Sequence, residues 1–267
     1  MSLLPFYHSE AISQGFPGTS ISDPYQFHEP DKDPERTNDQ MGSAIKNCNI
    51  PALEGLFKNT KIHINKNLAM KMAVNEGYWK MVARLLKDPG FNPFVDDNLA
   101  IRLAAEKGHL AIVEFLSEDP RVNPSAAQNG AIRSAAQMGH VDVVKMLLQD
   151  PRVDPSAAQN QAIQLAVTAG QTEIVKTLLN DPRVNPSDRN NEAIVLATQN
   201  RRTSILKILL QDPRVDPSAR SNQALKVAAR QHHIDTFTML LQDPRVHNLL
   251  GSRLEEFMRT FANHFYR

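Results

Sequence analysis

The sequence predicts an all-α solenoid of about seven short helical repeats that ends in a capping helix at the carboxyl terminus. The main observation is the dipeptide Asp-Pro, which recurs with a spacing of 31 residues, without one insertion or deletion, at positions 88, 119, 150, 181, 212 and 243. A fixed period of this size indicates one small unit copied head to tail, and such a unit is stable only when it stacks on its neighbours. Any functional surface is therefore expected to be repetitive.

Each repeat has room for two helices and one extended connection. In the copy that starts at Asp150, the apolar residues from Ala162 to Ala166 predict a first helix, Gly170 interrupts it, and the residues from Ile174 to Leu179 predict a second helix. Ala162 and Ala166 belong to a stripe of small residues that recurs in every copy. This stripe is expected to let neighbouring helices approach closely.

Two other positions carry expectations about the backbone. Asn stands just ahead of each first helix, at 67, 98, 129, 160, 191 and 222, and is expected to be the N-cap, accepting a hydrogen bond from an otherwise unpaired N–H. Arg201 and His232 stand where the other copies have the glycine of the turn between the helices. A left-handed backbone is expected there, unless these two turns are remodelled.

Residues 104–109 and 135–140 read Ala-Ala-Glu-Lys-Gly-His and Ala-Ala-Gln-Met-Gly-His, and each stretch is followed by two aliphatic residues and then leucine. This pattern resembles the core of the ankyrin repeat, A-A-x-x-G-H-x-x-V-V-x-x-L-L, and the resemblance extends over about residues 41–246. The family's T-P-L-H is replaced by Asn-x-Ala-Ile, and its glycine-containing link by Asp-Pro-Arg-Val-Asp/Asn-Pro-Ser. The unit is thus two residues shorter than the usual ~33, and this compact variety resembles the arrays of protists, large viruses and intracellular bacteria.

Three regions are expected along the chain. Residues 1–40 contain five prolines and show no helical period, so they are predicted to be extended or disordered; their aromatic residues leave open whether they lie along the solenoid or carry a docking motif. Residues 41–248 are predicted to form the solenoid, with a degenerate first repeat at about 41–66. Residues 249–267 hold a capping-box spacing and an apolar stripe, which predict a helix that seals the last repeat. A helix on a membrane surface is the alternative, but its polar face lacks an excess of positive charge.

The overall composition excludes several classes of protein. The net charge is +1, which predicts no bulk attraction to polyanions, although residues 1–60 are acidic and arginines outnumber acids beyond residue 185. The single cysteine, Cys48, excludes an internal disulfide, and no signal peptide or membrane-spanning run is evident. We therefore expect a cytoplasmic protein in a reducing compartment, which is the cytosol of a host cell if the protein is a secreted effector.

No group of residues has the pattern of an active site or a metal site. His109 and His140 occupy the same place in successive repeats, but stacked helices lie ~8–10 Å apart, so both rings are expected to hydrogen-bond across repeat boundaries rather than share a zinc ion. Cys48 and His63 lie in no catalytic signature, and there is no phosphate-binding loop. The arginine of each Asp-Pro-Arg is expected to be neutralised by the aspartate beside it, with a phosphate-reading stripe as the alternative. We predict no enzymatic activity, no metal and no cofactor.

Positions that repeat are used for stacking, so positions that vary between copies are free to bind a partner. They cluster at the hairpin tips and at the outer ends of the first helices, and the resemblance to ankyrin proteins implies that both sets line one concave groove. Tyr78 and Trp79 are also predicted to contact the partner, because Tyr and Trp are typical interface anchors. Packing against the N-terminal segment explains these two residues equally well. The predicted partner-binding residues are the anchors Tyr78 and Trp79, followed by Phe94, Val95, Asp96, Glu106, Lys107, Gln137, Met138, Thr168, Arg189, Asn190, Gln199, Asn200, Arg202, Arg220, Arg230 and Gln231.

The sequence thus predicts a monomeric protein–protein interaction module that serves as a scaffold, an adaptor or a competitive blocker and spans no membrane. The groove changes from apolar and acidic near Phe94 to basic near Arg189, Arg220 and Arg230, which fits a partner with an acidic segment. The alternative is binding of nucleic acid or another acidic ligand through the arginine-rich carboxyl half, which would weaken steeply with salt. Ordinary solvated residues on a surface without a partner would give the same pattern.

Overall fold

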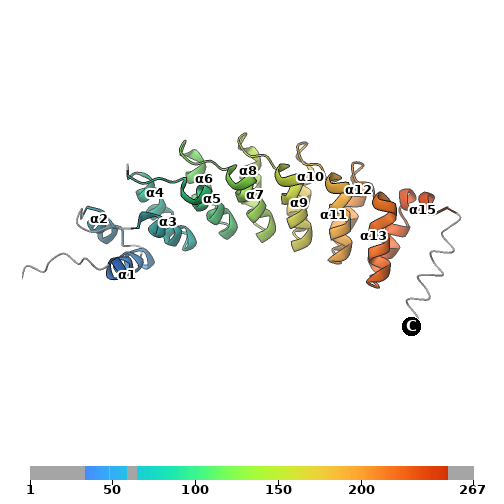
Figure 1. Cartoon of the computed structure of the whole chain (residues 1–267), viewed down its shortest axis with the longest axis horizontal. Coiled ribbons are helices and arrows are strands. Elements are labelled where there is room, and N and C mark those ends of the chain that lie inside the picture. The colour runs from blue at the N-terminus through green and yellow to red at the C-terminus, as the bar shows by residue number, and fades with distance from the viewer. Residues whose placement is uncertain (1–33, 48, 59–64, 89, 252–267) are drawn as a thin grey trace, which may run out of the picture.

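The structure of the protein is a computed structural model that describes residues 34–47, 49–58, 65–88 and 90–251. Within these residues it contains fifteen α-helices and no strand. Figure 1 shows the helices as pairs that stand side by side in one gently curved row. The prediction of an all-α solenoid is therefore confirmed.

Each repeat contributes a first helix and a second helix. The first helices are α1 (Pro34–Lys46), α3 (Lys66–Asn75), α5 (Val95–Lys107), α7 (Ala126–Met138), α9 (Ala157–Ala169), α11 (Asp188–Gln199) and α13 (Ala219–Arg230). The second helices are α2 (Ile50–Lys58), α4 (Trp79–Leu86), α6 (Leu110–Glu118), α8 (Val141–Gln149), α10 (Thr172–Leu179), α12 (Thr203–Gln211) and α14 (Ile234–Leu241). Helix α15 (Pro244–Leu250) follows the last pair.

Small residues bring the first helices close together. The two alanines that recur in every first helix are buried in each complete repeat, and Ala162 and Ala166 are only 1% and 0% exposed. The first helices of neighbouring repeats consequently pack against each other more extensively than the second helices do. A row that is tighter on one side bends toward that side, so the first helices form the concave face.

Enlarging one of these alanines is expected to destabilise the row. Ala166→Leu should lower the free energy of unfolding by ~1–3 kcal/mol, because the added atoms force neighbouring helices apart. Gln159→Ala, at an exposed position of the same repeat, should cost under ~0.5 kcal/mol. Urea unfolding compares the two variants, and equal midpoints would mean that the buried and exposed positions of the repeat are wrongly assigned.

The two ends of the row differ from the expected limits of the regions. Helix α1 begins at Pro34, inside the segment 1–40 that is predicted to be extended, and its residues Met41 and Ile45 are fully buried. Proline suits the first position of a helix because the N–H that it lacks would have no partner there. At the other end, the link after Asp243 lacks the second proline of the other links, and the chain continues as α15. Residues 1–33, and the predicted capping helix except at 249–251, lie outside the described residues.

The repeated asparagine is not the N-cap of its own helix, which corrects the expectation from the sequence. Asn129, for example, ends a left-handed turn that also contains Ala127 and Gln128, with φ from 52° to 57°. Its side-chain oxygen accepts a hydrogen bond from the backbone N–H of Asp154 in the next repeat, at 2.8 Å. An N-cap normally has an extended backbone, and the left-handed conformation directs the amide across the repeat boundary instead. Equivalent bonds join Asn98 to Asn123, Asn160 to Asn185 and Asn191 to Asp216.

Candidate partner-binding surface

The arginine of each Asp-Pro-Arg link is a structural tie between neighbouring repeats. The Arg183 guanidinium donates to both carboxylate oxygens of Asp181, at 2.7 and 3.0 Å. It also donates to the backbone oxygens of Val153 and Leu148 in the preceding repeat, each at 2.9 Å. Corresponding contacts are made by Arg121, Arg152, Arg214 and Arg245. The expected neutralisation of each arginine by its aspartate is confirmed, and most of the donors that a phosphate would need are already in use.

These contacts also change the acidity of the aspartates. Hydrogen bonds from the Arg183 side chain hold the pKa of Asp181 below its ordinary value, and burial, which acts in the opposite direction, is the smaller effect. The corresponding arginines lower the pKa of Asp119, Asp150, Asp212 and Asp243 in the same way. The links are therefore ion pairs that need an ionised carboxylate.

Acid is expected to weaken these ties. A carboxylate whose pKa is lower in the folded than in the unfolded chain stabilises the fold above its unfolded pKa of about 3.9, and this contribution is lost as the pH falls through the lower folded value. The urea midpoint should therefore fall steeply only below about pH 4. Replacing the five link aspartates by asparagine should lower the midpoint at neutral pH and flatten this dependence; an equally steep fall in that variant would assign the acid sensitivity to other groups.

A second set of repeated side chains ties the repeats together at the turns between first and second helices. The Nε2 atoms of His140 and His109 lie 2.8 and 3.3 Å from the backbone oxygens of Glu106 and Asn75 in the preceding repeats. The expected role of both histidines across repeat boundaries is confirmed. At the equivalent positions, Tyr78, Gln171, Arg202 and His233 bond to the backbone oxygens of Lys46, Gln137, Thr168 and Thr198. Tyr78 and Arg202, both predicted to contact a partner, thus also hold the fold.

The predicted partner residues fall on two rims of the concave face. The hairpin rim, where the first helices start, carries Phe94, Val95, Asp96, Arg189, Asn190 and Arg220. The turn rim, where the first helices end, carries Glu106, Lys107, Gln137, Met138, Thr168, Gln199, Asn200, Arg230 and Gln231. About eight residues of right-handed helix separate the rims, which is about 12 Å. A partner that contacts both rims must therefore cross the middle of the first helices.

That middle is lined by side chains that were not predicted from the sequence. Arg102 is partly exposed and donates to the backbone oxygens of Asp96 and Asp97, at 2.7 and 3.0 Å. Arg133 and Gln164 make similar contacts with the backbone of the left-handed turns in their own repeats. The sequence does contain a signal for this set, because its members differ between copies and each stands two residues after the first alanine of the small-residue stripe.

Each rim also carries one exposed apolar side chain. Phe94 on the hairpin rim and Met138 on the turn rim are both 53% exposed. Trp79, at the start of α4 in the outer layer, is 50% exposed, and the Lys80 ammonium lies 5.8 Å from the centre of its ring. Isolated exposed apolar residues are common, but aromatic residues and methionine are enriched at protein interfaces. Phe94 and Met138 are therefore the best candidates for anchors on the concave face.

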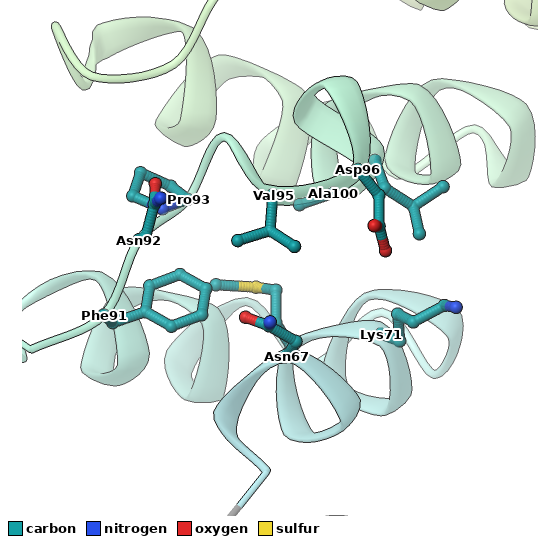
Figure 2. Close-up of a pocket in the computed structure, with 10 residues that line it drawn as sticks. Asn67, Lys71, Phe91, Asn92, Pro93, Val95, Asp96 and Ala100 are labelled. Atoms are coloured by element: carbon teal, nitrogen blue, oxygen red, sulfur yellow. The ribbon is translucent and has the colours of Figure 1, made fainter.

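A small cleft opens on the hairpin rim between the first two complete repeats. Figure 2 shows Val95 and Asp96 on one side of the gap and Asn67 and Lys71 on the other. Here Asn65 is the N-cap of α3, and Asn67 is exposed instead of bridging to the next repeat. The cleft has a volume of about 20 Å³, and a single water molecule needs about 10–15 Å³. It has room for a water molecule or the tip of a side chain, and it is too small for a cofactor.

The basic end of the hairpin rim is largely engaged in contacts within the chain. The Arg220 guanidinium forms an ion pair with Glu192 at 2.9 Å and also donates to the backbone oxygen of Arg189. The Arg189 guanidinium donates to the side-chain oxygen of Gln164 at 3.4 Å. Arg230, at the end of α13 on the turn rim, is exposed and forms no ion pair with another described residue. Of these three arginines, Arg230 is the most available to a partner.

The described residues offer no cluster for metal chemistry. Among them, no three side chains of His, Cys, Asp or Glu come close enough together to hold a metal ion. The histidines and aspartates of the repeat are instead joined one by one to backbone oxygens and to arginines. In the same part of the chain, no helix combines the length and the apolar character that crossing a bilayer requires.

The comparisons with known proteins agree with this geometry. The family model described as "Ankyrin repeats (3 copies)" matches the chain over residues 69–159, 101–190 and 163–248. Among solved structures, the ankyrin repeat domain of Bcl-3, described as a unique member of the IkappaB protein family, is similar in fold, with a TM-score of 0.57. It is 21% identical in sequence, and the similarity covers 79% of this chain and 97% of that one. No curated protein matches the chain. Because the family model covers well over half of the residues, the chain belongs to the ankyrin-repeat family.

Proposed function

We propose that the protein is a non-catalytic recognition module that binds another protein on its concave face, as a scaffold, an adaptor or a competitive blocker. The observation that carries the proposal is the contrast between repeated and variable positions. Repeated side chains such as Arg183 and His140 are used in bonds between repeats, whereas variable ones such as Phe94 and Met138 face solvent. Ankyrin repeats are generally protein–protein interaction modules, which supports the same conclusion.

The two anchors suggest how a partner lies on the surface. Phe94 stands on the hairpin rim just ahead of α5, and Met138 stands on the turn rim at the end of α7. A segment that covers both anchors crosses the first helices close to Arg102 and Arg133. Interfaces usually concentrate their binding energy in a few such anchors near the centre, with polar groups around them.

A capture experiment tests this proposal. The full-length chain is immobilised, and the captured proteins are identified and quantified by mass spectrometry. The double variant Phe94→Ala with Met138→Ala should bind the main partner at least about thirtyfold less tightly, because truncation of a central anchor commonly costs 2 kcal/mol or more, which is a factor of about thirty in affinity. Its circular dichroism and urea midpoint should be unchanged, since both side chains are exposed. Lys145→Ala, at an exposed position on α8, is the control.

Undiminished capture by the double variant would move the site away from the concave face. Trp79 and the aromatic segment that precedes α1 would then be tested next. We also propose that the protein acts as a monomer in a reducing, cytoplasmic compartment, since it carries a single cysteine, Cys48.

A further inference from the structure

The last two turns between first and second helices carry basic residues where the four turns before them carry glycine. Gly77, Gly108, Gly139 and Gly170 have φ of 73°, 74°, 95° and 84°. At the same position Arg201 and His232 have φ of 54° and 56°, so the turns keep the left-handed backbone and are not remodelled. For a residue with a side chain this conformation costs ~1–2 kcal/mol. Two neighbouring turns thus bear a cost that the four turns before them avoid.

Arg201 also changes the hydrogen bond that joins its own turn, between α11 and α12, to the next turn, between α13 and α14. At Gly108, an added Cβ would lie 2.4 Å from the ring of His140, so the absence of a side chain lets that ring reach the oxygen of Glu106. Arg201 has a Cβ at this place, and His233 reaches a carbonyl one position earlier in the repeat, that of Thr198, through Nδ1 at 3.0 Å. The junction between α11–α12 and α13–α14 therefore differs from the four junctions before it, in which His109, His140, Gln171 and Arg202 bond to the equivalent backbone oxygen.

Hollows lie on both sides of Arg201. One, of about 290 Å³, is lined by Arg201, Thr203, His233, Ile234, Asp235 and Thr236. The other, of about 200 Å³, is lined by Gly170, Thr172, Arg201, Arg202, Thr203, Ser204 and Ile205. Ile234 is 53% exposed. An exposed apolar side chain at the start of α14 thus lies next to the basic side chains of Arg201 and His233.

Positive charge predominates around these hollows. The basic turn edge consists of Arg201, Arg202 and His233, which line the hollows, together with Arg230 at the end of α13 and His232 in the turn that follows it. Asp235 is the one carboxylate among the residues that line either hollow. Arg201 and Arg230 are exposed, and neither forms an ion pair within the described part of the chain. Arg202 is held by the backbone oxygen of Thr168, at 3.0 and 3.3 Å. The two arginines of this edge that form no ion pair, Arg201 and Arg230, contrast with Arg220 on the hairpin rim, which is paired with Glu192.

We propose that the basic turn edge docks an acidic segment of a partner protein, with carboxylates at Arg201 and Arg230 and an apolar side chain against Ile234. The inference rests on the proposed function in taking the partner to be a protein, and it adds where the partner's acidic segment binds. Asp235 and Ile234 favour a peptide of mixed character over a nucleic acid, whose backbone presents one charge per ~1.7 Å and no aliphatic side chain. The strain at Arg201 is then explained, because its side chain serves binding rather than folding.

The test uses a defined probe, a fluorescein-labelled peptide of alternating glutamate and leucine, with the glutamine–leucine peptide as its uncharged control. Fluorescence anisotropy with the full-length chain should show tighter binding of the glutamate peptide. Arg201→Gly and Arg230→Ala should each weaken that binding about fivefold, the upper range for an exposed ion pair. Arg201→Gly restores the residue that the earlier turns use, so its urea midpoint should not fall and a loss of binding cannot be attributed to unfolding.

Two control variants keep the test specific. Lys145→Ala on α8 and Arg189→Ala on the hairpin rim each remove one positive charge elsewhere, and both should bind the glutamate peptide as the wild type does. Wild-type affinity in Arg201→Gly, or an equal loss in Arg189→Ala, would overturn the proposal. Displacement of the peptide by single-stranded DNA at a lower concentration than by unlabelled peptide would also overturn it, in favour of nucleic acid. The Phe94 and Met138 double variant should still bind the peptide, which separates this surface from the proposed anchors.

Discussion

Replacing Asn160 by alanine is expected to lower the free energy of unfolding by about 2–3 kcal/mol. Asn160 is buried at a repeat boundary, where its side chain accepts a hydrogen bond from the N–H of Asn185 at 2.7 Å and donates to the carboxylate of Asp188 at 2.9 Å. Alanine removes both hydrogen bonds and leaves the N–H of Asn185 without its partner. Leaving a buried donor unpaired costs more than the net value of one hydrogen bond. Urea unfolding measures the loss, and hydrogen exchange should accelerate at the amide of Asn185.

Asn222 supplies a matched control within the same chain. It is buried and left-handed, with φ of 63° against 57° for Asn160, but its side-chain oxygen has no hydrogen-bond partner in the structure. The reason is that α15 takes the place of the link that would donate to it. Asn222→Ala is expected to cost under about 1 kcal/mol. Equal losses in the two variants would show that asparagine is selected for its left-handed backbone and not for the bond across the boundary.

The solenoid was predictable because its signals are local and repeated. The Asp-Pro spacing defines the unit, and Ala162 and Ala166 indicate which helices pack closely. The sequence left open whether the turn at Arg201 keeps the left-handed backbone of the four preceding copies, which have glycine there, or is remodelled; the structure shows that it is left-handed. The predicted extended segment, residues 1–40, reached too far along the chain. Its prolines indicate an extended chain, whereas Pro34 is the first residue of a helix.

The contacts across repeat boundaries were harder to predict. Asparagine ahead of a helix is typical of an N-cap, and nothing in the sequence near Asn129 shows that its bond goes to Asp154, 25 positions away. The ion pair between Arg220 and Glu192 was equally hard to predict, because it depends on how two repeats are stacked. The separation of the two rims, by contrast, follows from helix length alone. The predicted partner residues stay predictions until the capture experiment is done.

Replacing Arg183 by methionine is expected to lower the free energy of unfolding by about 2–3 kcal/mol. The side chain bridges a carboxylate and two backbone oxygens of the preceding repeat. Its loss leaves Asp181, whose side chain is only 12% exposed, without its cation. Because Arg183 itself is 38% exposed, solvent weakens each bond and the total is less than their sum. Arg183→Lys should lose most of the same stability, since one ammonium cannot replace a planar fork that reaches four oxygens.

A double-mutant cycle with Asp181→Asn separates the ion pair from the bonds to the backbone. If the carboxylate is the main partner, the double variant should be little less stable than Arg183→Met alone, and the coupling energy should be about 1 kcal/mol or more. If the bonds to Val153 and Leu148 dominate, Asp181→Asn should cost little and the two changes should be additive. Arg230→Met, at an exposed position without such ties, should leave the urea midpoint unchanged. If Arg183→Met loses no more stability than Arg230→Met, the link arginines do not have the structural role proposed for them. The recurrence of arginine at 121, 152, 183, 214 and 245 would then have to be explained by binding.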